Sequence, residues 1–422
     1  MSILWRDAMS RALYGPGGFF VADTGPADHF RTSVHASPAF ATALLRLITE
    51  VDATLGHPSR LDVVDVGAGR GELLRTIHEA VGVSARRSPG EPSLVAARPP
   101  LAERVRFTAV EYADRPEDLP EEINWTAEIP GEITGVLLAT EWLDNVPLDV
   151  AVQTEDGWRY VLVDPESGAE TIGEPVSPND RDWLTMWWPS PTSPRSKDGD
   201  PDRAPTASAD ATSGSESGFG AARPAQGSSL TARSRPGCPE TPHSAHPAET
   251  HSAHPTEPPS AHPAETHSAH RAEIGRTRDD AWADAVQKIS RGLALAVDYG
   301  HLREARPVDG TLTGYRGGRQ VVAVPDGTTD VTAHVAMDSV ASAGAAVARC
   351  AYSLVLQREA LHALGADGGR PPLSMAGTDP AGYVRALAAA SQVAELTDPV
   401  GLGGHWWLRQ PVGIPLGPAV AR

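Results

Sequence analysis

The sequence is poor in cysteine and lacks long apolar runs, and each shortage excludes a class of protein. Two cysteines in 422 residues exclude a disulfide-stapled scaffold and a metal site built from cysteine. The longest nearly apolar stretch, residues 340–356, is interrupted by Arg349 and falls short of the roughly 20 residues that span a bilayer. Arg6 and Asp7 stand where a signal peptide would be apolar. We therefore expect a soluble, cytoplasmic protein without membrane insertion.

Positive charge is also scarce. Lys and Arg total 36 against 54 Asp and Glu, which gives a formal net charge of −18. Nucleic-acid binding needs a basic surface, and so does adhesion to anionic lipid, so neither partner is expected. The length suggests two or three domains at roughly 100–200 residues each.

The composition changes at about Ser190, beyond which Pro, Ser, Thr, Ala, Glu and His dominate up to about Glu273. Such a stretch buries too little apolar surface to offset its ordering entropy, so we predict a disordered insertion over residues 190–279. An eight-residue repeat, HSAHPAET, begins there at His243. Its His-x-x-His spacing is compatible with metal binding, but disordered imidazoles lack the neighbours that orient true ligands. We interpret the tract as a solvated linker and expect no metal.

Outside this insertion, apolar β-branched runs alternate with helical patterns. The strands are predicted at 61–66, 105–111, 133–139 and 293–298, and the helices at 9–14, 72–81, 281–290 and 340–362. Buried strands separated by helices indicate an α/β protein with a doubly wound parallel sheet. In such sheets ligands bind beyond the carboxyl ends of the strands, so functional residues are sought there.

A glycine-rich segment, DVGAGRG at residues 65–71, lies between a predicted strand and a predicted helix. It is compatible with a plain tight turn or with a nucleotide-binding loop. A dinucleotide loop would have a small residue at position 72, where Glu72 would repel a pyrophosphate. Asp65 instead suits a ligand with an ammonium group, such as S-adenosylmethionine, and the loop resembles motif I of class I methyltransferases. The residues predicted to bind this cofactor are Asp65, Gly67, Ala68, Gly69 and Gly71.

Glu111 ends the second predicted strand, where a carboxylate can accept hydrogen bonds from both ribose hydroxyls. Its distance from the glycine loop is longer than the usual ~20 residues. A Pro- and Arg-rich stretch at 88–100 accounts for the excess. The alternative is a surface glutamate at a strand end.

Several further segments, in their order along the chain, resemble the MidA-type family of bacterial and mitochondrial methyltransferases, whose mitochondrial relative is the arginine methyltransferase of complex I assembly. They are ALYGPGGFF (12–20), FRTS (30–33), DVGAGRGELL (65–74), TEWLDNVPLDV (140–150), AVDYG (296–300), GTLTGYRGG (310–318) and TDVTAHV (329–335). The sequence departs from the family at Thr140, where the family has Asn, and at His29, where it has Asp, unless that acidic residue has shifted to Asp28.

The resemblance implies a class I (Rossmann-like) methyltransferase fold, S-adenosylmethionine as cofactor, and Thr32 and Ser33 as further cofactor contacts. It also implies a protein substrate bearing an arginine. The implied domains are an N-terminal cover (1–60), a first part of the core (61–189), the insertion (190–279) and a second part of the core (280–422). A small-molecule methyltransferase and a cofactor-binding assembly factor with little turnover remain alternatives.

Four residues are candidates for handling the acceptor. Glu141 and Asp144 follow a central strand and can hold a charged guanidinium by paired hydrogen bonds, unless they cap the following turn. Asp330 and His334 can act as orienter and proton acceptor, although a histidine in an apolar run is often a core residue. Asp298, at the end of another strand, is a further candidate for the cleft or for a structural pair.

Overall fold

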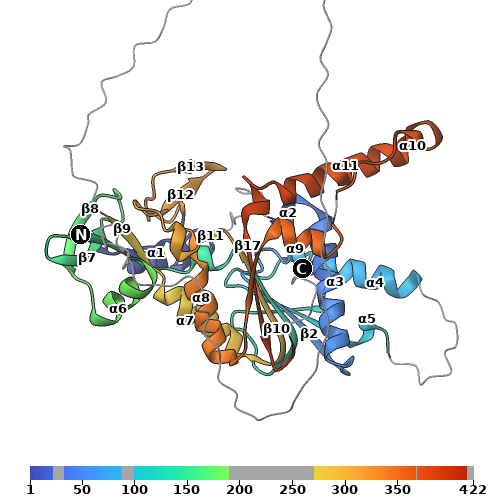
Figure 1. The fold of residues 1–422 in the computed structure, drawn as a ribbon, viewed down its shortest axis with the longest axis horizontal. Helices are drawn as coiled ribbons and strands as arrows, with labels where there is room; N and C mark the ends of the chain where they lie inside the picture. Colours follow the sequence, from blue (N-terminus) through green and yellow to red (C-terminus); the bar gives the residue numbers. More distant parts are fainter. Residues whose placement is uncertain (22–32, 88–98, 190–269, 367, 416–422) are drawn as a thin grey trace, which may run out of the picture. The chain divides into compact units, whose positions relative to one another are not determined.

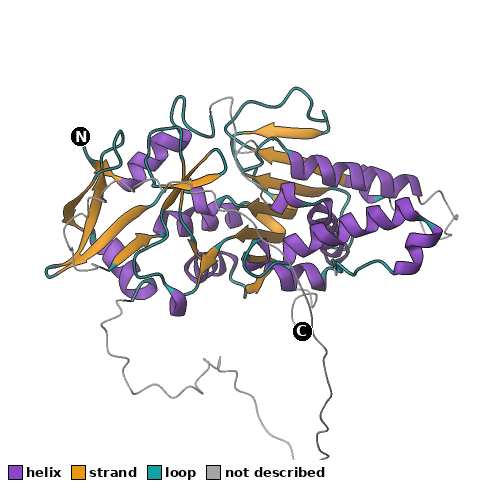
Figure 2. Ribbon diagram, turned by 90° about the horizontal axis from the view of Figure 1, so that it is seen from above, coloured by secondary structure: helices purple, strands orange, loops and turns teal. Residues whose placement is uncertain are grey.

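A computed structural model describes residues 1–21, 33–87, 99–189, 270–366 and 368–415. This part of the chain is a mixed α/β structure (Figures 1 and 2). The predicted cofactor residue Thr32 and residues 190–269 of the predicted insertion lie outside the described residues. Within the described ranges, each helix is too short or too polar to span a bilayer.

A seven-stranded sheet forms the centre of the fold. In spatial order its strands are β16 (Ser353–Leu356), β17 (Trp406–Val412), β10 (Ile289–Asp298), β5 (Ile133–Thr140), β2 (Leu61–Val66), β3 (Val105–Val110) and β4 (Ile123–Thr126). The five strands from β10 to β4 pair in parallel. The strand β17 runs antiparallel to both β10 and β16. The parallel strands therefore end at one common edge.

The apolar runs of β5 and β10 are continuous because both faces of the sheet are buried. Val136 and Leu138 pack into the core on one face, whereas Leu137 and Ala139 pack on the other. The first core is shared with α3 (Pro38–Thr54), α4 (Glu72–Arg87), α9 (Gln357–Ala363) and α11 (Pro380–Thr397). The second core is shared with α7 (Arg276–Gln287) and α8 (Met337–Ala348). Figure 1 shows these two groups of helices on opposite sides of the sheet.

Smaller strands and helices lie outside the central sheet. An antiparallel sheet contains β1 (Ile3–Leu4), β6 (Asp149–Thr154), β7 (Gly157–Val163), β8 (Glu170–Pro175) and β9 (Arg271–Ile274). The other strands are β11 (Gly300–His301), paired with β15 (Val335–Ala336), and β12 (Thr313–Arg316), between β13 (Arg319–Val321) and β14 (Asp330–Thr332). The remaining helices are α1 (Trp5–Tyr14), α2 (Ser33–Ala36), α5 (Leu101–Arg104), α6 (Pro178–Trp187) and α10 (Leu373–Thr378), with short 3₁₀ turns at η2 (Leu143–Asn145), η3 (Arg303–Ala305) and η4 (Leu402–Gly404).

The strands predicted from the apolar runs are confirmed, and two other expectations are wrong. The predicted helix over 340–362 is two helices separated by β16, because α8 ends at Ala348 and Arg349 takes a left-handed φ of 53°. The predicted insertion over 190–279 extends too far, since β9 and the start of α7 lie within it. Ala272 and Ile274 are buried against α6, which offsets the cost of ordering this segment.

The close approach of β5 and β10 gives a test of the strand register. A Cβ at Gly292, where φ is +148°, would lie 1.9 Å from the carbonyl oxygen of Gly135. We expect Gly292→Ala to lower the free energy of unfolding by more than about 2 kcal/mol, because two paired backbones must separate. A Cβ at Gly131 meets no atom within 4 Å, so Gly131→Ala should change it by less than about 0.5 kcal/mol. Equal stability of the two variants in chemical denaturation would contradict this register.

Candidate active site

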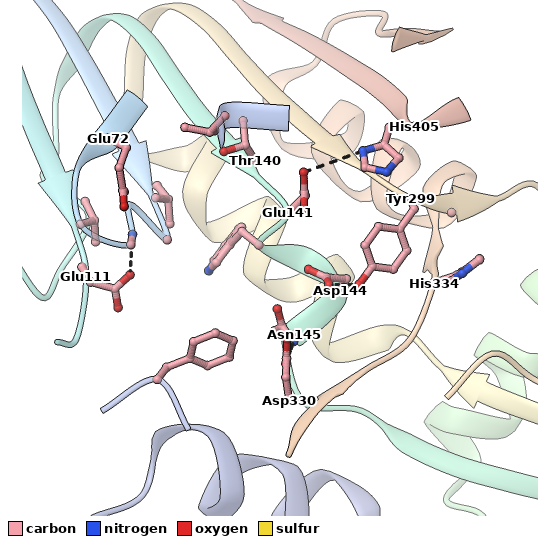
Figure 3. A pocket seen from close by; sticks show the side chains of 18 of the residues that line it. Glu72, Glu111, Thr140, Glu141, Asp144, Asn145, Tyr299, Asp330, His334 and His405 are labelled. Atoms are coloured by element: carbon pink, nitrogen blue, oxygen red, sulfur yellow. Dashed lines mark hydrogen bonds and ion pairs between the residues drawn. The ribbon is translucent and has the colours of Figure 1, made fainter. Parts of the chain in front are cut away.

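A cavity of about 980 Å³ lies at the carboxyl ends of the parallel strands (Figure 3). Residues that directly follow β2, β3, β5 and β10 line it, as expected for a sheet of this kind. Its acidic lining residues are Glu72, Glu111, Glu128, Glu141, Asp144, Asp284 and Asp330. Lys288 also lines the cavity. The excess of carboxylates favours a cationic ligand.

The glycine loop forms one wall of this cavity. Gly67 and Gly71 have φ of 71° and 76°, a conformation that side-chain-bearing residues rarely adopt. A Cβ at Gly67 would lie 3.1 Å from Trp142, and one at Gly71 would lie 2.7 Å from Leu119. Both glycines are therefore required for the turn itself. Gly67 and Gly69 line the cavity, and Ala68 donates a backbone hydrogen bond of 3.3 Å to Val110.

Glu111 lies directly beside the glycine loop. Its carboxylate accepts hydrogen bonds from the backbone N–H groups of Gly69, at 3.0 Å, and Tyr112, at 2.7 Å. Burial raises the pKa of Glu111, and the two backbone donors oppose that rise. Glu111 therefore lies at the end of β3 in the wall of the cavity, the position that the sequence predicts for it.

Asp65 lies beneath the loop and is 1% exposed. Its Oδ1 has no hydrogen-bond partner among the described residues. Burial, together with the nearby charges of Glu72 and Glu111, raises the pKa of Asp65 to about 8. A cationic group on the cavity side of the loop would relieve this unfavourable burial of charge.

Glu141 is the first residue after β5 and has a left-handed φ of 52°. Non-glycine residues adopt this conformation infrequently. Its Oε1 accepts a hydrogen bond of 3.0 Å from the backbone N–H of Ser33, the first residue of α2, and lies 4.0 Å from Nδ1 of His405. Burial lowers the pKa of His405 to about 4, so this imidazole is neutral at pH 7. Glu141 thus ties the N-terminal segment to the cavity.

Asp144 lies in the turn η2 and is 3% exposed. Asp298 accepts hydrogen bonds from the backbone N–H groups of Leu143 and Asp144, at 3.0 and 3.3 Å. The carboxylate that caps this turn therefore belongs to Asp298, and the Asp144 side chain is left for another role. The Oδ2 of Asp144 accepts hydrogen bonds from Tyr299 and Thr332. Its Oδ1 is buried and has no partner among the described residues.

Asp330 and His334 lie on the same segment but face different neighbours. Asp330 accepts a hydrogen bond of 2.8 Å from Asn145, and burial, followed by the charge of Asp144, raises its pKa to about 8. The ring of His334 packs edge-on against Tyr299, with the ring centroids 5.1 Å apart. Figure 3 shows the two side chains apart, with Asp330 below Asn145 and His334 beyond Tyr299. The structure thus does not bring together the predicted orienter and proton acceptor.

Three further residues shape this end of the cavity, and the sequence assigned no role to them. Tyr299 and His405 line the cavity beside Asp144 and Glu141. The guanidinium of Arg278 is buried beneath it and donates to the carbonyl oxygens of Val146, at 3.1 Å, Ala333 and Asp144. Tyr299 falls within the segment AVDYG (296–300) that resembles the MidA-type family, whereas His405 lies outside the segments named above. Arg278 has no motif, because backbone carbonyls leave no signature in a sequence.

Comparison with known proteins identifies the family. The model of the Methyltransf_28 family, described as "Putative S-adenosyl-L-methionine-dependent methyltransferase", matches residues 43–354. The chain belongs to this family. No curated protein matches the sequence.

Two crystal structures of COG1565 superfamily proteins from Burkholderia thailandensis resemble the fold. Each aligns with this chain with a TM-score of 0.63 and 18% sequence identity. The alignments cover 100% of this chain, 91% of the first crystal structure's chain and 90% of the second's. The first is described as a "likely methyl transferase" bound to S-adenosyl-homocysteine, and the second is a native structure of an uncharacterized protein.

The burial of Asp65 makes a prediction about stability and pH. The raised pKa means that the folded protein binds this proton more tightly than the unfolded chain, whose value is near 3.8. The group therefore costs up to about 1.4 kcal/mol of stability per pH unit as the pH rises from about 4 to 8. Asp65→Asn should match the wild type near pH 4 and be several kcal/mol more stable at pH 8. If the free energy of unfolding varied with pH in the same way for the wild type and for Asp65→Asn, ionisation of Asp65 would not destabilise the folded protein, and the prediction would be wrong.

Proposed function

We propose that the protein is an S-adenosylmethionine-dependent methyltransferase that methylates the guanidino group of an arginine in a protein substrate. The observation that carries the acceptor part of this proposal is the unpartnered Oδ1 of Asp144, a buried carboxylate oxygen in a residue that lines the cavity. A buried polar atom without a hydrogen-bond partner costs free energy. A methyl-accepting substrate that donates an N–H hydrogen bond to this oxygen would remove that cost.

The architecture supports a class I methyltransferase core. The strand order, the antiparallel β17 next to an otherwise parallel sheet, and the helices on both faces are the features of a doubly wound Rossmann-like sheet. In this proposal the core begins at α3, which packs against the central sheet, and continues after the insertion from β9 onward. The helix α1 forms part of a cover, which Tyr14 supports by lining the cavity.

The glycine loop and Glu111 are proposed to bind the cofactor. Gly67, Ala68, Gly69 and Gly71 would let its amino-acid part approach the backbone, while Asp65 below the loop would balance its ammonium group. Glu111 would accept hydrogen bonds from the ribose. The backbone N–H of Ser33 already donates to Glu141 and its hydroxyl contacts Gln357, so Ser33 would act by holding α2 in place.

The acceptor would enter from the side of Asp144, Glu141 and Asp330. When bound, the cofactor supplies an activated methyl group, so these residues need mainly to orient the attacking nitrogen and take its proton. A guanidinium has a pKa above 12 and arrives charged. Asp144 would hold it. Burial raises the pKa of Asp330 to about 8, so Asp330 is mostly protonated at neutral pH, and the charge of the guanidinium would favour the ionised form that can accept the proton. His334 is the alternative acceptor for this proton.

The cavity mouth supports a polypeptide as substrate. Tyr112 and Val400 both line the cavity, yet they are 65% and 95% exposed. Large apolar side chains exposed at a binding site are typical of surfaces that contact a partner. A free amino acid would leave them in water.

The proposal is tested by following a labelled methyl group. We expect label from S-adenosylmethionine, incubated with the protein and a cell extract, to appear in the protein fraction and, after acid hydrolysis, in methylated arginine. Boiled enzyme is the control. Label in small metabolites would instead indicate a small-molecule methyltransferase. If no methyl group were transferred to any fraction, the remaining alternative would be an assembly factor that binds the cofactor without turnover.

The two candidate acceptor carboxylates give a second test. Asp144→Asn should lower the rate of methyl transfer by about two orders of magnitude or more while the affinity for the cofactor is retained, because the variant keeps the shape but loses the charge. Glu141→Gln should act in the same direction, and the double variant should be less than additive. Asp149→Asn removes a carboxylate that is 5% exposed in β6 and does not line the cavity, and serves as control. Wild-type rates in both site variants would contradict these roles.

A further inference from the structure

Asp144 is held at almost every polar atom by a different element of the fold. Its backbone N–H donates to Asp298, at the end of β10. Its carbonyl oxygen accepts from Arg278, in α7, and from the backbone N–H of Ala333 at 3.3 Å. Among the described residues, Oδ1 of the side chain is the polar atom left without a partner. The arrangement fixes where this oxygen lies.

The side chain itself is fixed by Tyr299 and Thr332. The phenol of Tyr299 donates to Oδ2 of Asp144 and also lies 2.6 Å from the hydroxyl of Thr332. Thr332 Oγ1 lies 2.7 Å from the same Oδ2. Two hydroxyl groups on one carboxylate oxygen set the rotation of the carboxylate, and therefore the direction of the other oxygen.

The ring of Tyr299 is held in turn by its neighbours. It lies between the imidazoles of His334 and His405, with centroid distances of 5.1 and 5.6 Å (Figure 3). The main chain of Tyr299 follows β10 directly, and its carbonyl oxygen accepts a hydrogen bond of 3.0 Å from Val335 in β15. A rigid phenol anchored to the central sheet can position Asp144 more precisely than a flexible side chain could.

We infer that Tyr299 is a positioning residue for the acceptor, one that aims Oδ1 of Asp144 at a cationic N–H donor. This inference rests on the proposed function, since it assigns Tyr299 a part in acceptor binding. Tyr299 need not touch the acceptor's reacting atoms. It acts through Asp144, and its loss leaves the cofactor wall around Gly67 and Glu111 intact.

The test uses methylguanidinium as a probe, titrated by ligand-observed NMR against the full-length protein saturated with S-adenosyl-homocysteine. Tyr299→Phe removes the phenol oxygen and keeps the ring. If this variant folds poorly, Thr332→Val is used instead, because it removes the other hydroxyl group that contacts Oδ2 of Asp144. The matched control is Tyr160→Phe, which removes a phenol that donates to the buried Asp180 outside the cavity. Urea, a neutral molecule of similar shape, controls for charge.

We expect saturable binding of methylguanidinium, but not of urea, to the wild type and to Tyr160→Phe. Tyr299→Phe should bind it roughly tenfold more weakly, as for loss of a hydrogen bond to a charged group, with unchanged affinity for S-adenosyl-homocysteine. In an Asp144→Asn background, Tyr299→Phe should have no further effect, because a residue that acts through Asp144 has nothing left to position.

The outcomes separate the two proposals. Wild-type affinity in Tyr299→Phe, or an equal loss in the Asp144→Asn background, would overturn the role of Tyr299 and leave the proposed function standing. A wild type that fails to bind methylguanidinium would contradict the cationic acceptor, and the role of Tyr299 with it. Parallel losses of thermal stability and of S-adenosyl-homocysteine affinity in Tyr299→Phe would make the residue structural.

Discussion

The burial of carboxylates at one edge of a parallel sheet is the constraint on which the rest of the site depends. Asp65, Asp144, Asp298 and Asp330 are all less than 10% exposed, and the first three each have an oxygen without a partner among the described residues. Burying carboxylates without partners costs free energy, and burial raises the pKa of Asp65 and Asp330 to about 8. It becomes favourable once a cationic ligand is present. The carboxyl ends of the strands therefore favour the binding of a positively charged group.

The residues of this acidic edge form two groups, which our proposal assigns to the cofactor and to the acceptor. The strands β2 and β3 carry the glycine loop and Glu111, whose contacts all lie within the first half of the chain. The strands β5 and β10 carry Glu141, Asp144 and Tyr299, which are held by residues far away in sequence, among them Ser33 and Thr332. Arg278 places one buried positive charge beneath the second group and donates to backbone carbonyl oxygens there, not to the carboxylates of Glu141 and Asp144. This separation is what a two-substrate transfer requires.

The sequence predicted the positions of the first group more fully than the geometry of the second, for a physical reason. Glycines in a strand–loop–helix and an acid at the next strand end are local patterns, and strand ends in a parallel sheet meet at one edge. Glu141 and Asp144 were found by the same rule. The partners that set their geometry were not, because Tyr299 and Asp144 are 155 residues apart and Arg278 binds backbone carbonyls. Short apolar runs such as β16 were also misjudged, since periodicity alone does not separate a short strand from a buried helix.

We propose above all that Oδ1 of Asp144 accepts a hydrogen bond from a cation held next to the cofactor. A crystal structure of the protein with S-adenosyl-homocysteine and methylguanidinium tests it most directly. The account predicts a guanidinium nitrogen within about 3 Å of Oδ1, on the side that faces the cofactor sulfur, with Tyr299 still donating to Oδ2. A guanidinium bound elsewhere, or an Asp144 whose Oδ1 has turned to a partner within the protein, would contradict it.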